Sequence, residues 1–175
     1  YLFVGSSKRN MVTCDFDQNT GFDFDVDIFV NDDDEDFKAK EIKTILMNAF
    51  DSVNENTRYS DCHDLTRVFT IKQVNIPESR IEHSYDLAIM HECQDGQRQY
   101  IHHNKRQNSY YWAYKKKGYY ERLKKERWCK ENKFWSEVRD TYINRKNQNS
   151  NSNKHSSSIY TETINEICNK YGYSS

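Results

Sequence analysis

Residues 22–28 have the sequence Phe-Asp-Phe-Asp-Val-Asp-Ile, in which apolar and acidic side chains alternate without a break. A period of two is typical of a β-strand, because successive side chains leave a strand on opposite faces. The apolar face would pack on a core, while Asp23, Asp25 and Asp27 would share the other face. We therefore expect a strand over about 22–30 that carries an acidic face.

The patterns on either side of this strand predict a mixed α+β fold in which a small mixed sheet packs with helices. Apolar residues at spacings of three and four predict a helix over 36–53, and later spacings predict a C-terminal helical part. A first domain would cover residues 1–104, and a basic, aromatic-rich helical part would cover 105–175, with a loose Asn/Ser-rich loop at 147–158. The expected strands lie near 2–4, 22–30, 68–74, 84–90 and, more weakly, 99–101. A helix or a helix pair is expected near 119–145, and a last short helix near 159–171.

Charge divides the chain into two parts of opposite sign. Residues 1–100 hold 10 Lys or Arg and 20 Asp or Glu, whereas residues 101–175 hold 16 and 7. An acidic part can collect cations, and a basic part can attract phosphates or nucleic acid, although the two parts could also simply neutralise each other. No apolar run reaches the ~20 residues of a membrane helix, so we expect no membrane partner.

The five cysteines are odd in number and widely spaced, with no Cys-x-x-Cys pair. This usage is typical of free thiols in a reducing compartment and predicts a cytoplasmic protein. The chain opens on Tyr1 rather than Met, so we also expect part of the natural N-terminus to be absent.

Three aspartates side by side on one strand face need a compensating charge, because neighbouring carboxylates repel each other and lose hydration. A divalent cation such as Mg²⁺ or Mn²⁺ supplies it, since hard cations prefer oxygen ligands. Asp86 begins another apolar strand, which could lie beside the first and add a third carboxylate. The competing interpretation is a solvent-exposed strand face whose aspartates bind no metal.

The segment Gly5-Ser6-Ser7-Lys8 offers a different chemistry. Glycine allows a close backbone approach, while hydroxyls, N–H groups and the lysine can bind the phosphates of a nucleoside triphosphate. Taken alone, such a segment is more often a plain turn.

Together, Val4-Gly5-Ser6, Asp25-Val26-Asp27 and Asp86 resemble the motif of the DNA polymerase beta superfamily of nucleotidyltransferases. The resemblance covers about residues 1–92 and implies a sheet of the nucleotidyltransferase type. It implies that Asp25, Asp27 and Asp86 hold metal ions, and that Gly5, Ser6, Ser7 and Lys8 bind the triphosphate. The long gap from Ser6 to Asp25 is similar to that of relatives of cyclic GMP-AMP synthase and oligoadenylate synthetase.

Several alternatives stay open at this point. The metal pair could be Asp23 with Asp25, or Asp15 with Asp17, in place of Asp25 with Asp27. The acceptor of the nucleotide could be RNA or a second nucleotide. Instead of an enzyme, the chain could be a silent nucleotide- or RNA-binding module or a toxin–antitoxin partner, and a metal-dependent nuclease is a further rival. The aromatic and basic stretch 110–120 could stack on nucleic-acid bases or pack on the sheet.

Overall fold

The computed structural model describes residues 1–15, 19, 21–31, 36–149 and 154–174. These residues form two compact units, Tyr1–Lys115 and Lys116–Ser175. The predicted boundary after residue 104 falls at the end of a strand inside the first unit. None of the described helices has both the length and the hydrophobicity of a membrane-spanning helix.

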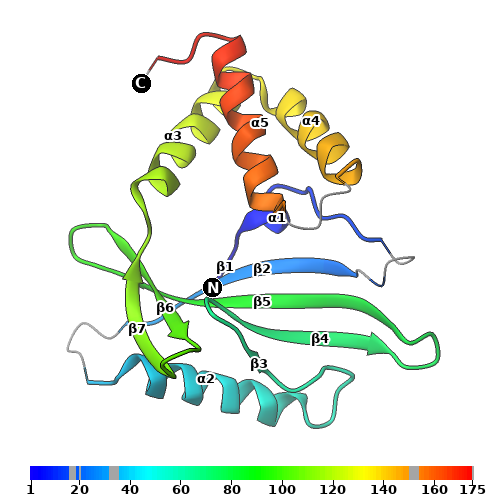
Figure 1. The fold of residues 1–175 in the computed structure, drawn as a ribbon, viewed down its shortest axis with the longest axis vertical. Helices are drawn as coiled ribbons and strands as arrows, with labels where there is room; N and C mark the ends of the chain where they lie inside the picture. Colours follow the sequence, from blue (N-terminus) through cyan, green and yellow to red (C-terminus); the bar gives the residue numbers. More distant parts are fainter. Residues whose placement is uncertain (16–18, 20, 32–35, 150–153, 175) are drawn as a thin grey trace. The chain divides into compact units, whose positions relative to one another are not determined.

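In the described part of the first unit, seven strands form one mixed sheet, which confirms the α+β prediction (Figure 1). The sheet order is β1-β2-β5-β4-β3, with β6 added to β5 and β7 added to β6. β2 and β5 are parallel, and every other pairing is antiparallel. The strands are β1 (Leu2–Phe3), β2 (Phe22–Phe29), β3 (His63–Asp64), β4 (Phe69–Asn75), β5 (Arg80–Glu92), β6 (Arg98–Asn104) and β7 (Ser109–Tyr114).

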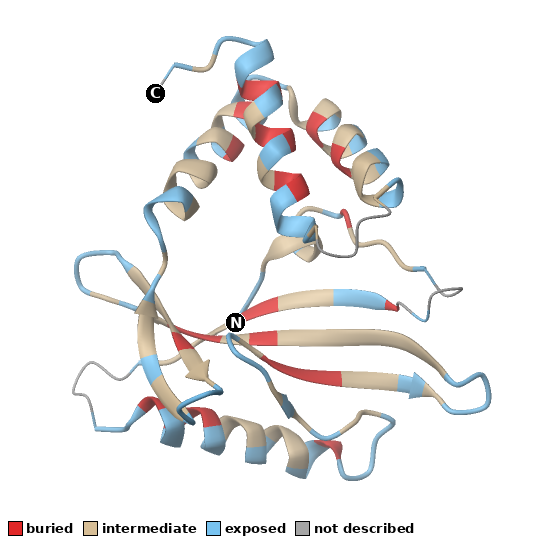
Figure 2. Cartoon of the chain, in the orientation of Figure 1, coloured by how far each residue is buried: buried red, intermediate tan, exposed pale blue. Residues whose placement is uncertain are grey.

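Helix α2 (Ala39–Asn54) covers one face of this sheet (Figure 1). Its buried residues Ala39 and Ile42 join a core with Val26, Phe69 and Leu87 from the strands. Figure 2 shows the buried positions of β2, β4 and β5 gathered at one end of the strands. The face of β2 that carries the apolar residues therefore packs on α2, as its alternation predicts.

Two segments differ from the sequence expectation. Strand β7 was expected only as an aromatic and basic stretch, but its Tyr110 and Trp112 pack against the core that α2 covers. The segment Gly5–Lys8, expected as a turn, forms the single helical turn α1. Aromatic side chains favour strands when half of them can be buried, which explains β7.

The second unit consists of α3 (Lys117–Glu131), α4 (Trp135–Asn147) and α5 (Ser156–Lys170). The helical stretch expected over 119–145 is divided between α3 and α4, where Lys133 adopts a φ of 65°. Cys129 of α3 and Cys168 of α5 are buried, with their Sγ atoms 3.7 Å apart. The predicted loose loop at 147–158 lies partly outside the described residues, and α5 begins within it.

Candidate metal and nucleotide site

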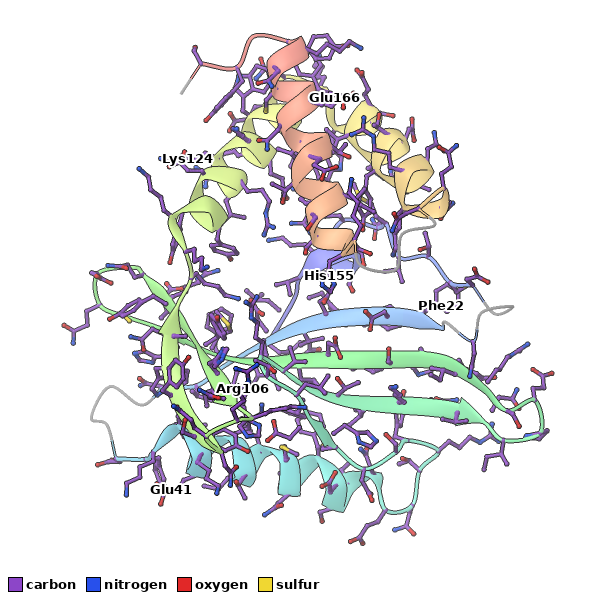
Figure 3. All side chains as sticks on the ribbon, viewed as in Figure 1. Phe22, Glu41, Arg106, Lys124, His155 and Glu166 are labelled. Atoms are coloured by element: carbon purple, nitrogen blue, oxygen red, sulfur yellow. The ribbon has the colours of Figure 1, made fainter. Side chains whose placement is uncertain are left out.

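The acidic face of β2 lies on the side of the sheet opposite the core. Val26 of β2 is 6% exposed and belongs to the core beneath α2. Asp23, Asp25 and Asp27 alternate with the core residues of this strand and therefore share its other face. Side chains leave both faces of the sheet (Figure 3). This second face carries the charged groups described below.

The parallel pairing of β2 with β5 places Asp25 directly opposite Asp86. Carboxylate oxygens of Asp23, Asp25 and Asp86 lie within 4.8 Å of one another. We call these three residues the carboxylate cluster. The predicted pair Asp25 and Asp86 is thus brought together, but the third member is Asp23 rather than Asp27. Asp17 of the third open pair lies outside the described residues.

Two hydroxyl groups orient the cluster. Ser84 Oγ donates to Asp23 Oδ1 at 2.8 Å, and Thr70 Oγ1 donates to Asp86 Oδ1. Thr70 lies on β4 directly opposite Asp86, because β5 pairs with β4 on its other side. Thr70 was not predicted from the sequence, because its position beside Asp86 follows only from the register of β4 against β5. These hydrogen bonds fix one oxygen each of Asp23 and Asp86.

The pKa of Asp25 is raised to about 6, mainly by burial and also by the neighbouring charges of Asp23 and Asp86. A backbone hydrogen bond from Ser6 and the charge of Arg9 act in the opposite direction. Burial also raises the pKa of Asp86, against the hydrogen bond from Thr70. Crowded, partly dehydrated carboxylates of this kind are a donor set that fits a hard divalent cation, which would relieve their repulsion.

The segment Gly5–Lys8 lies against Asp25. Val4 N–H donates to Asp25 O at 2.9 Å, and Asp25 N–H donates to Ser7 Oγ at 3.2 Å. Gly5 has a φ of 57°, and a Cβ atom there would lie 1.9 Å from Asp25 Oδ2. A larger residue would therefore displace the carboxylate, and the positive φ independently favours glycine. The glycine and the aspartate of the predicted motif are in direct contact.

Asp27 has a different environment from the cluster. It is 5% exposed and pairs with Ala88 in the register of β2 and β5. Burial raises its pKa, while the charges of Lys115, Arg98 and Lys8 lower it. Asp27 therefore faces cations supplied by the chain, and the prediction that it is a metal ligand stays a prediction.

Comparison with known proteins finds similarity among solved structures. No protein-family model matches the chain, and no curated protein matches it. A solved structure of the CD-NTase CdnG from Bradyrhizobium diazoefficiens, in complex with GTP, is similar with a TM-score of 0.41 and 14% sequence identity. The similarity covers 65% of this chain and 30% of that one, so this chain spans less than a third of its neighbour's length.

Proposed function

We propose that this protein is a metal-dependent nucleotidyltransferase, which moves a nucleoside monophosphate from a nucleoside triphosphate to a hydroxyl group. The observation that carries the proposal is the contact between Gly5 and the carboxylate cluster. Such a contact places a backbone segment able to bind phosphates beside carboxylates able to hold a cation. Either element alone would be weak support.

Asp25, Asp86 and Asp23 are the residues that would hold Mg²⁺ or Mn²⁺. Bound there, the ion would lower the pKa of the acceptor hydroxyl and offset the charge of the triphosphate. Gly5, Ser6, Ser7 and Lys8 would bind the β- and γ-phosphates through N–H, hydroxyl and ammonium groups. These contacts would hold the α-phosphorus in line with the acceptor.

Asp86 is our candidate for the general base, because its raised pKa suits a carboxylate that must take up a proton. The acceptor oxygen would form a bond to the α-phosphorus, and the bond from that phosphorus to the β-phosphate bridging oxygen would break. The hydroxyl proton would pass to Asp86, and pyrophosphate would leave. Thr70, which donates to Asp86 Oδ1, would keep the carboxylate oriented during this transfer.

The test is pyrophosphate release from each of the four nucleoside triphosphates with Mg²⁺ or Mn²⁺, with and without RNA. We expect release by the wild type, loss of release in Asp25→Asn, and retention in the control Asp95→Asn, which changes an exposed turn residue. Shortened RNA without pyrophosphate would instead identify a nuclease. Nucleotide binding without any turnover, by folded protein, would identify a silent binding module.

The same assay distinguishes the pair Asp23 and Asp25 from the pair Asp25 and Asp27. If Asp23 and Asp25 hold the cation with Asp86, Asp23→Asn should raise the Mg²⁺ concentration needed for half-maximal release far more than Asp27→Asn does. The reverse order would restore Asp27 as the ligand. Isothermal titration with Mn²⁺ in the absence of nucleotide provides the same comparison without turnover.

A further inference from the structure

The sheet face that carries the carboxylate cluster continues across β5 onto β6 and β7. Tyr100 of β6 pairs with Met90 of β5, and Tyr111 of β7 pairs with His102 of β6. Because residues paired in register share a face, Tyr100, His102 and Tyr111 lie on the cluster side. We call these three residues the aromatic platform.

The rings of the platform follow one another across the two strands. The centroids of Tyr100 and His102 are 6.3 Å apart, and those of His102 and Tyr111 are 5.0 Å apart with an interplanar angle of 34°. Tyr111 is 47% exposed, so part of its ring is open to solvent. A row of rings on a sheet face is the arrangement on which unpaired bases stack.

Two cations accompany the platform. Lys115 Nζ lies 4.9 Å from the centroid of the Tyr100 ring, and Arg67 Cζ lies 5.8 Å from it. Arg67 is exposed, and its loop is held against β6 by the hydrogen bond from His103 N–H to Thr66 O at 2.8 Å. Positive charge beside stacked rings matches a chain of phosphates and bases.

The platform is not explained by packing of the core. The residues that alternate with it, Ile101, Tyr110 and Trp112, belong to or pack against the core beneath α2. The two strands therefore already bury one set of large side chains, and the second set of rings lies on the opposite face.

The distance from the cluster to the platform fits one extended nucleic-acid strand. Asp86 and Met90 are four residues apart on β5, and Tyr100 is one strand further, which corresponds to about 14 Å. A strand end placed at the cluster would therefore bring bases one or two nucleotides away onto the rings.

We infer that the aromatic platform and its cations bind single-stranded nucleic acid, which presents its terminal hydroxyl to the carboxylate cluster as the acceptor. The inference rests on the proposed nucleotidyltransferase function for the role of acceptor. Binding itself depends only on the platform and its cations, so it can be measured with a catalytically inactive variant in the absence of metal.

The first experiment measures fluorescence anisotropy of a labelled ten-nucleotide RNA with the Asp25→Asn protein in EDTA. Tyr111→Ala should weaken binding by about 5- to 10-fold, because one stacking surface is lost. The matched control is Tyr114→Ala, since Tyr114 lies on the same strand, is 55% exposed, and leaves the opposite face of the sheet. It should leave the affinity unchanged.

A second pair of variants tests the charges. Arg67→Gln should weaken binding and reduce its salt dependence, whereas Arg58→Gln, an exposed arginine in another loop, should change neither. Three outcomes would each overturn the inference. They are an equal loss of affinity in the two tyrosine variants, an equal loss of affinity in the two arginine variants, and equal affinity of the protein for duplex and single-stranded RNA.

Failure of the inference and failure of the proposed function give different results. Binding that depends on Tyr111, with no pyrophosphate release from the wild type, would support the nucleic-acid-binding role of the platform and reject the nucleotidyltransferase function. Pyrophosphate release with mononucleotides, without any binding of single-stranded nucleic acid, would support the nucleotidyltransferase function and reject the nucleic-acid-binding role of the platform.

Discussion

Asp25 and Asp64 are both partly buried carboxylates of the first unit and lie on opposite faces of its sheet. The charges that surround them differ in sign. Lys43 Nζ lies 2.6 Å from Asp64 Oδ1, and Tyr110 Oη donates to Asp64 Oδ2 at 2.5 Å. Burial raises the pKa of Asp64, but the hydrogen bonds from Lys43 and Tyr110 outweigh it and leave that pKa below its ordinary value. Asp25 faces two further carboxylates, and its pKa is about 6.

The difference shows where the protein supplies its own counter-charge. Lys43 is 2% exposed and also donates to the carbonyl oxygens of Leu65 and Val68, so it joins α2 to the loop before β4. At Asp64 the charge pair serves the fold. At the carboxylate cluster the repulsion is only partly offset by the chain, which suits a cation taken from solution.

The largest expected effect is a separation of activity from stability. Asp25→Asn should reduce pyrophosphate release on the order of 1,000-fold, because a group at the reacting centre is lost. Asp64→Asn should instead destabilise the first unit by about 3 kcal/mol, because it leaves Lys43 buried without its carboxylate. Release assays and urea unfolding of both proteins provide the comparison. A folded, fully stable Asp64→Asn would show that the two carboxylates do not differ in this way.

The contact between Gly5 and Asp25 gives the next effect. Gly5→Ala should lower pyrophosphate release on the order of 100-fold, because the added Cβ would displace Asp25 Oδ2. Gly96→Ala is the control, since Gly96 also has a positive φ, of 78°, but its added Cβ would meet nothing within 4 Å. It should cost about 1 kcal/mol of stability and no activity. Equal activity of the two variants would reject the contact as a positioning element.

The pH dependence of stability should have opposite signs for the two carboxylates. Because the folded pKa of Asp25 is raised from 3.8 to about 6, its contribution to stability is present below pH 4 and is lost as the pH rises through 6. The loss should be about 2 kcal/mol in EDTA, after allowance for the exposed part of the side chain. Asp64, whose pKa is lowered, contributes above its unfolded pKa and loses that contribution in acid.

Urea unfolding below pH 4 measures the sign for Asp64, and urea unfolding between pH 4 and pH 8 measures the sign for Asp25. Asp25→Asn should flatten the decline between pH 4 and pH 6, and Mg²⁺ should restore the stability of the wild type above pH 6. Asp64→Asn should leave the decline intact. A wild-type curve that rises throughout this range, in the absence of metal, would contradict the raised pKa of Asp25.

The smallest effect concerns the Tyr110 hydroxyl, which donates a hydrogen bond to Asp64. Tyr110→Phe should lower the free energy of unfolding by about 1 kcal/mol, because one hydrogen bond to the carboxylate is lost while the ring packing is kept. Tyr114→Phe, at an exposed ring of the same strand, should change stability by much less. Pyrophosphate release should be equal in both variants, since Asp64 has no part in the proposed chemistry.

The sequence predicted those parts of the fold that depend on local periodicity. The alternation at 22–30 and the spacing at 36–53 correctly predict β2 and α2, because each element buries one face on the same core. β7 was missed because its aromatic residues are equally suited to stacking on a ligand. The break between α3 and α4 depends on the left-handed conformation of Lys133, for which lysine gives no signal.

The candidate site was predictable only as far as strand alternation goes. Alternation places Asp23, Asp25 and Asp27 on one face, but it cannot say which of them meets Asp86. The register of β2 against β5, set by packing between distant segments, brings Asp23 and Asp25 to Asp86 and leaves Asp27 opposite Ala88. The register of β4 against β5 likewise places Thr70 beside Asp86, and local alternation could not predict it.

The parallel pairing of β2 with β5 also bears on the order of folding. Asp25 and Asp86 belong to strands whose connection contains α2, β3 and β4, so their approach closes a long loop and raises the contact order. During synthesis, the aspartates of β2 leave the ribosome well before their partner exists. The carboxylate cluster can therefore form only once the central sheet has assembled, and binding of the proposed cation would report completion of that step in a refolding experiment.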